Sequence, residues 1–299
     1  MSALEISGTT RARFVATTLN SSLGARIDGL DLAEDVDAPV IAALEQALAV
    51  HKVLVFRDQH LTPENQRRFA ARFGALYVHP LKPHIAEIPE ILVLEHTGSQ
   101  PPPASRWHAD STFLEKPPMG SMLYCIVCPP LGGDTIWSDC VAAYDALSPG
   151  VRSLLDTLEA EHSISKEVRA EHYATPERKA KWEQTRQANP PVKHPVVRTH
   201  PMTGQKTLFV NEAFTTHIVG LKPQESAALL GFLLGHLARP EFAYRHRWMP
   251  NDLVFWDNRS TQHFVITDYF PHQRRMHRAA IWTSRTGCES FSTIGSRGR

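Results

Sequence analysis

The chain has 299 residues, with 32 lysines and arginines against 31 aspartates and glutamates, so its formal net charge is +1. This length allows one large domain or two small ones, and the balanced charge argues against a basic nucleic-acid-binding surface. Residues 1–20 lack the apolar stretch of a signal peptide, and the apolar run at 227–234 is too short to span a bilayer, so we expect neither secretion nor a membrane partner.

Short strands and amphipathic helices alternate in the first half of the chain. Alternating apolar and polar residues predict a hairpin within 14–32, and buried strands are predicted at 53–56 and 91–94. Apolar residues at helical spacing predict a helix at 39–51. A second helix is predicted from the N-cap Thr62 to Phe73, before Gly74. Residues 77–89, which are rich in proline and histidine, are predicted to form a loop.

Short strands and helices also alternate in the second half of the chain. Helices are predicted at 149–160, from 176 onward and at 223–238. Strands are predicted at 121–127, 208–210, 242–248, 253–256, 264–266 and 279–283. The polar stretch at about 164–193 predicts an active-site lid, and the Ser-, Gly- and Arg-rich residues 286–299 predict a loose tail. Many short strands and no internal repeat predict a single, mainly β domain over 1–299, a jelly-roll sandwich with flanking helices.

Four cysteines occur, at positions 125, 128, 140 and 288. Cys125 and Cys128 form a C-x-x-C pair, but no second pair stands at zinc spacing. We therefore expect reduced thiols buried in the core, and with them a cytoplasmic location.

The segment around Trp107-His108-Ala109-Asp110 is the strongest candidate for a site. In an extended strand, residues i and i+2 point to one face, so His108 and Asp110 would present an imidazole and a carboxylate together. A His-x-Asp pair alone is often a chance occurrence. A second histidine, His263, follows a strand and a turn at Asp257-Asn258, and Arg274 follows it. Two imidazoles and one carboxylate are the ligand set of non-haem Fe(II) oxygenases, and an arginine suits a carboxylate.

From about Gly24 to Thr286 the sequence resembles the taurine dioxygenase family of Fe(II)- and 2-oxoglutarate-dependent enzymes. The stretches that carry the resemblance are Trp107–Asp110, Gly132–Thr135, His194–Pro201, Phe209–Glu212, Trp256–Arg259 and Arg275–Arg278. The resemblance implies a double-stranded β-helix, the cupin-like jelly roll, with Fe(II), 2-oxoglutarate and O2 as cofactor and cosubstrates. It implies that His108, Asp110 and His263 bind iron, and that Arg274 and Thr135 hold the distal carboxylate of 2-oxoglutarate.

The resemblance also implies a site for a small anionic substrate. Arg278 and His79 match the family's partners of a sulfonate, and Phe214 matches an aromatic wall. The positions that would contact the taurine amine are Lys82, Pro103 and Ala104, with Val168 in place of a second aromatic residue. Lysine repels an ammonium group, and proline and alanine side chains accept no hydrogen bond from it. We therefore expect an anion without a terminal amine, longer or more apolar than taurine.

The predicted activity is hydroxylation of the carbon next to a sulfonate or sulfate. Sulfite or sulfate and an aldehyde would then be released, with succinate and CO2 as co-products. An alkyl sulfate or an aryloxyalkanoate carboxylate is the alternative substrate of the same chemistry. A cupin-like binding module without enzymatic activity is the alternative of another class. We also expect a homo-oligomer, a dimer or a tetramer.

Overall fold

The computed structural model describes residues 14–167 and 173–282. Its helices are α1 (Ala38–His51), α2 (Pro63–Ala70), α3 (Cys140–Asp145), α4 (Pro149–Leu155), η1 (Ile164–Lys166), α5 (Pro176–Ala188), α6 (Pro223–Leu237) and η3 (Pro240–Phe242). Its strands are β1 (Val15–Thr18), β2 (Ala25–Asp28), β3 (Val53–Phe56), β4 (Leu76–Tyr77), β5 (His84–Ile85), β6 (Ile88–His96), β7 (Gly120–Val127), β8 (Thr135–Asp139), β9 (Glu159–His162), β10 (Val192–Pro195), β11 (Val197–Thr199), β12 (Lys206–Leu208), β13 (Thr215–Ile218), β14 (Ala243–His246), β15 (Leu253–Asp257), β16 (Thr261–Val265) and β17 (Arg274–Ile281).

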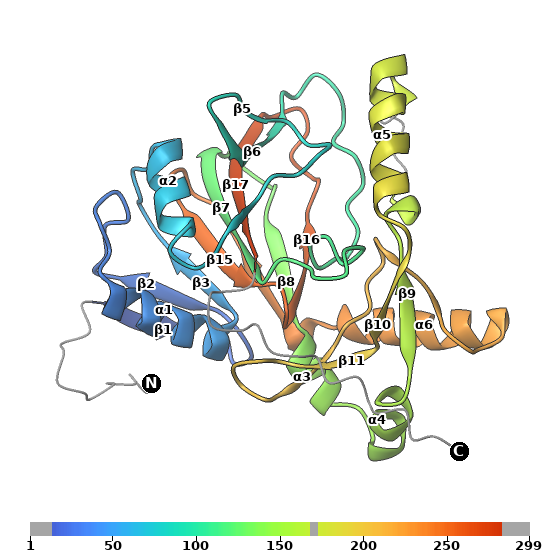
Figure 1. Cartoon of the computed structure of the whole chain (residues 1–299). Coiled ribbons are helices and arrows are strands. Elements are labelled where there is room, and N and C mark those ends of the chain that lie inside the picture. Colours follow the sequence, from blue (N-terminus) through green and yellow to red (C-terminus); the bar gives the residue numbers. More distant parts are fainter. Residues whose placement is uncertain (1–13, 168–172, 283–299) are drawn as a thin grey trace.

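Two sheets form the centre of the molecule (Figure 1). The larger has the order β1-β2-β3-β15-β7-β17-β6-β5, and β4 also pairs with β17. The smaller has the order β14-β8-β16. A buried cluster joins them, because Val254 and Met276 of the large sheet share it with Trp137 of the small sheet. This is the sandwich arrangement of a jelly roll.

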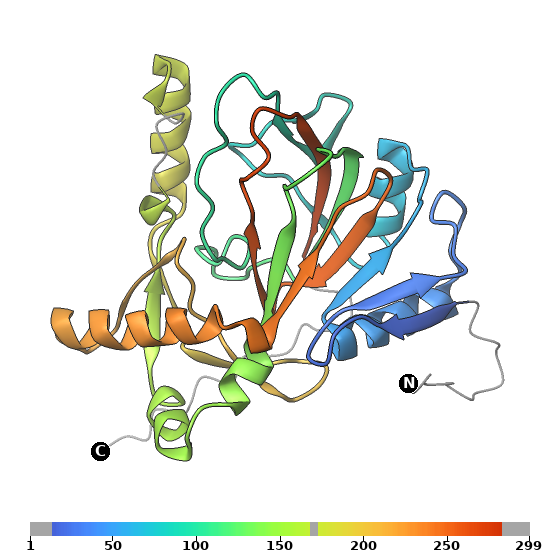
Figure 2. The same cartoon turned by 180° about the vertical axis from the view of Figure 1, so that it is seen from behind.

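Alternation along the strands assigns the two faces of the large sheet. Leu253 and Phe255 of β15 belong to the cluster formed with α1 and α2, whereas Val254 and Trp256 belong to the cluster between the sheets. Successive side chains point to opposite faces of a strand, so a strand buried on both faces is apolar throughout. Figures 1 and 2 show α1 and α2 lying along the large sheet, opposite the small one.

A third region carries the predicted insert. Strand β9 pairs with β10 and β13 in a small separate sheet. The chain between β9 and β10 includes η1 and α5. In Figure 1 helix α5 stands upright beside the sandwich, above these strands. That this insert acts as a lid stays a prediction.

The double-stranded β-helix predicted from the sequence is confirmed, but several element assignments were wrong. The helix predicted at 149–160 ends at Leu155, and residues 159–162 form strand β9 instead. The loop predicted at 77–89 contains β5 and parts of β4 and β6. The predicted His108 strand is a single isolated bridge to His263. The predicted loose tail lies outside the described residues.

Candidate active site

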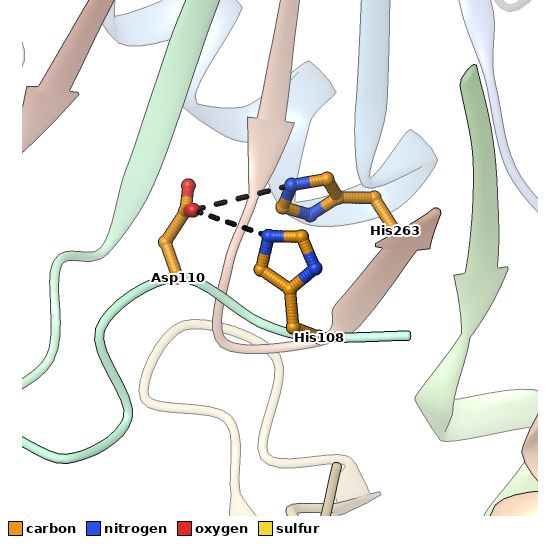
Figure 3. A group of neighbouring side chains, drawn as sticks. All are labelled: His108, Asp110 and His263. Carbon is orange, nitrogen blue, oxygen red and sulfur yellow. Dashed lines mark ion pairs between the residues drawn. The ribbon is translucent and has the colours of Figure 1, made fainter. Parts of the chain in front are cut away.

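Three potential metal ligands from distant parts of the sequence point toward one another (Figure 3). The Nε2 atoms of His108 and His263 each lie 3.9 Å from Oδ1 of Asp110. The three ligand atoms lie within 4.8 Å of one another, and no other group of this kind occurs in the part of the chain that the structure describes. One carboxylate oxygen and two imidazole nitrogens around a common point can hold a single transition-metal ion.

Backbone hydrogen bonds fix the relative position of these ligands. The His108 amide donates to the carbonyl of His263 at 3.1 Å, and the His263 amide donates to the carbonyl of His108 at 2.8 Å. Asn258, in the turn between β15 and β16, accepts a hydrogen bond from the Asp110 amide at 2.6 Å and donates to the Asp110 carbonyl at 3.0 Å. The ligand segment is thereby tied to β16 although it forms no strand of its own.

The side chains are in the states that metal binding requires. Nδ1 of His108 lies 2.8 Å from the Arg106 carbonyl; a carbonyl only accepts, so Nδ1 carries the proton and Nε2 presents its lone pair. Burial, and then the neighbouring His108, lower the pKa of His263 well below its usual range, so this imidazole is neutral. Burial by itself would raise the pKa of Asp110, but Arg278, the two histidines and a hydrogen bond from Ser121 lower it, so the carboxylate is ionised.

A buried polar network holds the segment that follows the first two ligands. Thr112 Oγ1 lies 2.9 Å from Nδ1 of His162 on β9 and accepts a hydrogen bond from Nδ2 of Asn211 at 2.9 Å. Nε2 of His194, on β10, lies 2.9 Å from the Thr112 carbonyl and 3.0 Å from the Leu114 carbonyl. The two strands that flank the insert therefore both contact the metal-ligand segment.

The histidines of this network predict a dependence of stability on pH. Burial and then nearby positive charge lower the pKa of His162 to about 3 and that of His194 to about 4, from 6.5. Between those values and 6.5 the unfolded chain binds more protons than the native one, so the free energy of unfolding falls as the pH falls through this window. We expect the thermal midpoint to drop from about pH 7.5 to about pH 5, and His162→Gln to reduce that drop, measured by circular dichroism.

His60→Gln is the control for this experiment, because the side chain of His60 is 74% exposed. It should leave the drop unchanged. An equal drop in the native protein and both variants would contradict the role assigned to the buried histidines.

The predicted cosubstrate residues lie together next to Trp248. Arg274 is 6% exposed, its Nε donates to the Gly133 carbonyl at 3.1 Å, and its guanidinium lies 6.0 Å from the centre of the Trp248 ring. Its Nη2 is buried and has no hydrogen-bond partner among the described residues. Thr135 Oγ1 accepts a hydrogen bond from Trp248 Nε1 at 3.0 Å, so its own proton can go to another acceptor. A buried arginine and a nearby hydroxyl donor suit a carboxylate.

Glycine at position 133 permits this arrangement. Its φ is +70°, and a Cβ there would lie 3.2 Å from Cδ of Arg274 and 2.9 Å from Cγ of Pro129. A side chain would therefore both strain the backbone and crowd the guanidinium.

The predicted substrate residues Arg278 and His79 lie near Asp110, because the charges of Arg278 and Asp110 both act on His79. Nη1 of Arg278 lies 2.7 Å from Oδ1 of Asp110. Burial, followed by the charges of Arg278 and Lys82, lowers the pKa of His79 to about 3, so this imidazole is neutral. Its Nδ1 accepts a hydrogen bond from the Leu81 amide at 3.1 Å. Nε2 therefore carries the proton and can donate to an anion.

The other predicted substrate positions are placed differently. The ring of Phe214 lies 5.2 Å from that of Phe113, in an apolar cluster with Trp182 against which Leu81 also packs. Lys82 is half-buried. Pro103 and Ala104 are exposed, and Val168 lies outside the described residues.

Comparison with known proteins gives the family. The family model described as "Taurine catabolism dioxygenase TauD, TfdA family" matches residues 16–280. The chain belongs to this family. Membership in the TauD/TfdA family makes the protein an oxidoreductase, a dioxygenase that depends on 2-oxoglutarate (alpha-ketoglutarate).

Its relatives in the TauD/TfdA family differ in substrate. An alpha-ketoglutarate-dependent sulfate ester dioxygenase from Pseudomonas putida is 37% identical over 267 residues, which are 87% of this chain and 86% of the relative. An alpha-ketoglutarate-dependent 2,4-dichlorophenoxyacetate dioxygenase from Cupriavidus pinatubonensis is 36% identical over 271 residues, 83% of this chain and 91% of the relative. The crystal structure of AAD-2 in complex with Mn(II) and N-oxalylglycine matches with a TM-score of 0.73 and 29% identity, covering 91% of this chain and 98% of that one.

Several residues that hold the three metal ligands in place were not predicted from the sequence. Ser121 donates to Oδ2 of Asp110 at 2.8 Å, and Thr112 and His162 form the network behind it. Ser121 is the second residue of the apolar strand β7, where a buried serine has no distinguishing pattern. The motif stretches His194–Pro201, Phe209–Glu212 and Trp256–Arg259 were the available signal, because they contain His194, Asn211 and Asn258.

Proposed function

We propose that the protein is an Fe(II)- and 2-oxoglutarate-dependent dioxygenase that cleaves sulfate esters or sulfonates with an apolar organic part. The observation that carries this proposal is the meeting of His108, Asp110 and His263 beside β17, on which Arg274 and Arg278 lie four positions apart. Residues at i and i+4 of a strand point to the same face. One strand thus supplies two guanidinium groups, one for each of two anions.

The surroundings of each guanidinium indicate which of the two anions it would bind. Arg274 is buried beside Trp248 and Thr135, a position that suits the distal carboxylate of 2-oxoglutarate. Arg278 contacts Asp110 and is close enough to His79 to lower its pKa, so an anion held there lies next to the metal ligands. When bound, Fe(II) would supply the activation of O2 and of the oxo acid, as the 2-His-1-carboxylate set does in other oxygenases.

The residues of the chain would orient the substrate and exclude water. Arg278 and the Nε2 proton of His79 would hold the sulfate or sulfonate oxygens. That places the adjacent carbon toward the metal ligands. Hydroxylation of this carbon consumes one O2 and one 2-oxoglutarate and yields succinate and CO2. The hydroxylated carbon then loses sulfate or sulfite and becomes an aldehyde.

The apolar neighbourhood favours an alkyl or aryl tail over an ammonium group. Phe113, Phe214 and Trp182 are buried in one cluster, and Leu81, two positions after His79, packs against it. Lys82 contributes positive charge at His79, which disfavours a second cation nearby. Among the relatives, the sulfate ester dioxygenase at 37% identity is consistent with this choice.

A substrate panel tests the proposal. Succinate formation would be measured with Fe(II), ascorbate and 2-oxoglutarate in the presence of hexyl sulfate, hexanesulfonate, taurine or phenoxyacetate. We expect either hexyl compound to exceed taurine by at least about tenfold in kcat/KM, the effect of one unfavourable charge contact of about 1.4 kcal/mol. Preference for taurine would refute the apolar tail, and preference for phenoxyacetate would favour the carboxylate alternative, which the relative at 36% identity represents. Absence of succinate with every compound would place the substrate outside these four classes.

The proposal also includes a cytoplasmic location and assembly into a homo-oligomer. The three cysteines that the structure describes are free, in keeping with a reducing cytoplasm. In the described ranges no helix has the length and apolar character needed to cross a bilayer. We expect a dimer or tetramer, which sedimentation velocity would measure directly.

A further inference from the structure

The two oxygens of the Asp110 carboxylate have different partners. Oδ2 accepts the hydrogen bond from Ser121 Oγ. Oδ1 lies 3.9 Å from Nε2 of each histidine and is therefore the oxygen that faces the metal position. The same Oδ1 accepts a hydrogen bond from Nη1 of Arg278 at 2.7 Å. One oxygen atom thus faces both the metal position and the guanidinium proposed to bind the substrate.

Arg278 has little alternative to this contact as long as no anion is present. Its side chain is 11% exposed, and its Nε is buried without a hydrogen-bond partner among the described residues. A buried guanidinium needs a nearby negative charge, and Asp110 supplies it. A divalent cation bound to Oδ1 would compete with Arg278 for the negative charge of Asp110. It would also place a second positive charge beside the guanidinium.

We propose that Arg278 competes with the metal ion for Oδ1 of Asp110, and that an anion bound to Arg278 relieves the competition. Metal ion and anion then bind cooperatively, each raising the affinity for the other by the same factor because binding free energies are linked. The identity of the anion rests on the proposed function; the competition between Arg278 and the metal ion does not.

Competition between Arg278 and the metal ion predicts an unusual result when a positive side chain is removed from the site. Removal of Arg278 takes away the competitor, so the metal ion should bind more tightly in the absence of any anion. Removal of an ordinary supporting residue would weaken metal binding instead, because ligands lose their orientation. The sign of the change therefore distinguishes competition from structural support.

The experiment uses the full chain and Mn(II) as the probe, with dissociation constants measured by isothermal titration calorimetry in a sulfate-free buffer without 2-oxoglutarate. For the native protein, saturating hexyl sulfate should tighten Mn(II) binding by about 5- to 150-fold, the usual range of coupling between two sites. Arg278→Met should bind Mn(II) about tenfold more tightly than the native protein, and hexyl sulfate should then have no effect.

Two further variants serve as controls. Arg275→Met removes the same charge from the same strand, but residue 275 points to the other face, so Mn(II) affinity and the response to hexyl sulfate should remain native. Arg278→Lys keeps the charge and should keep Mn(II) affinity within about threefold of native. Should Arg278→Met fail to fold, Arg278→Gln replaces it, because it also removes the charge. Tighter Mn(II) binding and no response to hexyl sulfate are again expected.

Weaker or unchanged Mn(II) binding by folded Arg278→Met would overturn the inference. So would an equal gain in Mn(II) affinity in Arg275→Met when no anion is present. The inference would also be overturned if the native protein turns over hexyl sulfate but hexyl sulfate leaves its Mn(II) affinity unchanged. The proposed function would survive that result. If hexyl sulfate is neither bound nor turned over, the proposed substrate is wrong, and the Mn(II) affinities measured without anion still decide the inference.

Discussion

His263→Ala is expected to lower the rate of succinate formation by at least about 10³-fold, equivalent to about 4 kcal/mol of the activation barrier. His263 supplies one of the three ligand atoms, and two ligands bind a divalent ion far more weakly than three. Its backbone bridge to His108 does not involve the imidazole, so the fold should survive. Mn(II) binding by calorimetry and thermal unfolding by circular dichroism would be measured beside the rate.

His60→Ala is the matched control, because it removes an exposed imidazole far from the ligands in sequence and should retain native activity. Native-like turnover of His263→Ala, with its fold intact, would exclude this histidine as a ligand. Asp110→Asn should behave as His263→Ala does, since the amide removes the negative charge of the ligand set.

Arg274→Leu is expected to raise the KM for 2-oxoglutarate by about 100-fold. Loss of one partner of a buried, hydrogen-bonded charge pair costs about 2–5 kcal/mol, and 100-fold corresponds to about 2.7 kcal/mol. The rate at saturating 2-oxoglutarate should change much less than KM. Steady-state kinetics of succinate formation against 2-oxoglutarate concentration would measure both parameters.

Arg274→Lys should have a smaller effect, because it keeps the charge but loses the two-pronged geometry of the guanidinium. Arg275→Leu, the neighbouring residue on the other face of β17, should leave KM within about threefold of native. An unchanged KM in Arg274→Leu would assign the distal carboxylate of 2-oxoglutarate to another residue and leave Arg274 as part of the core.

Both guanidinium groups reach the site only because β17 presents Arg274 and Arg278 on the same face. The strand alternates between the two faces, so Arg274, Met276 and Arg278 point between the sheets, whereas Ala279 and Ile281 pack toward α1 and α2. A shift of one residue in register would turn both arginines away from the metal ligands. The pairing of β17 with β6 and β7 is therefore as important to the proposed function as the identity of the arginines.

Local sequence determined a large part of this architecture. Thr62 and Pro63 begin α2 as expected, with a capping hydrogen bond from the Asn65 amide to Thr62 Oγ1 at 3.1 Å. The continuous apolar run at 53–56 forms a fully buried strand. The family motif stretches contained His108, Asp110 and Arg278, whereas His263 and Arg274 lie just outside them. These features depend on local sequence patterns, such as a helix cap, a turn or an alternation of apolar and polar residues. They can therefore be predicted without knowledge of the fold.

Only the tertiary structure decided how the ligand segment is held. The sequence favoured a strand for His108 and Asp110, but Ser111 has a φ of +51°, and the segment leaves the strand direction after its single bridge. Its position comes instead from Asn258, Ser121 and His162, which are distant in sequence. Long-range hydrogen bonds of this kind leave no periodic signal, because each partner satisfies a buried polar group that exists only once the chain has folded.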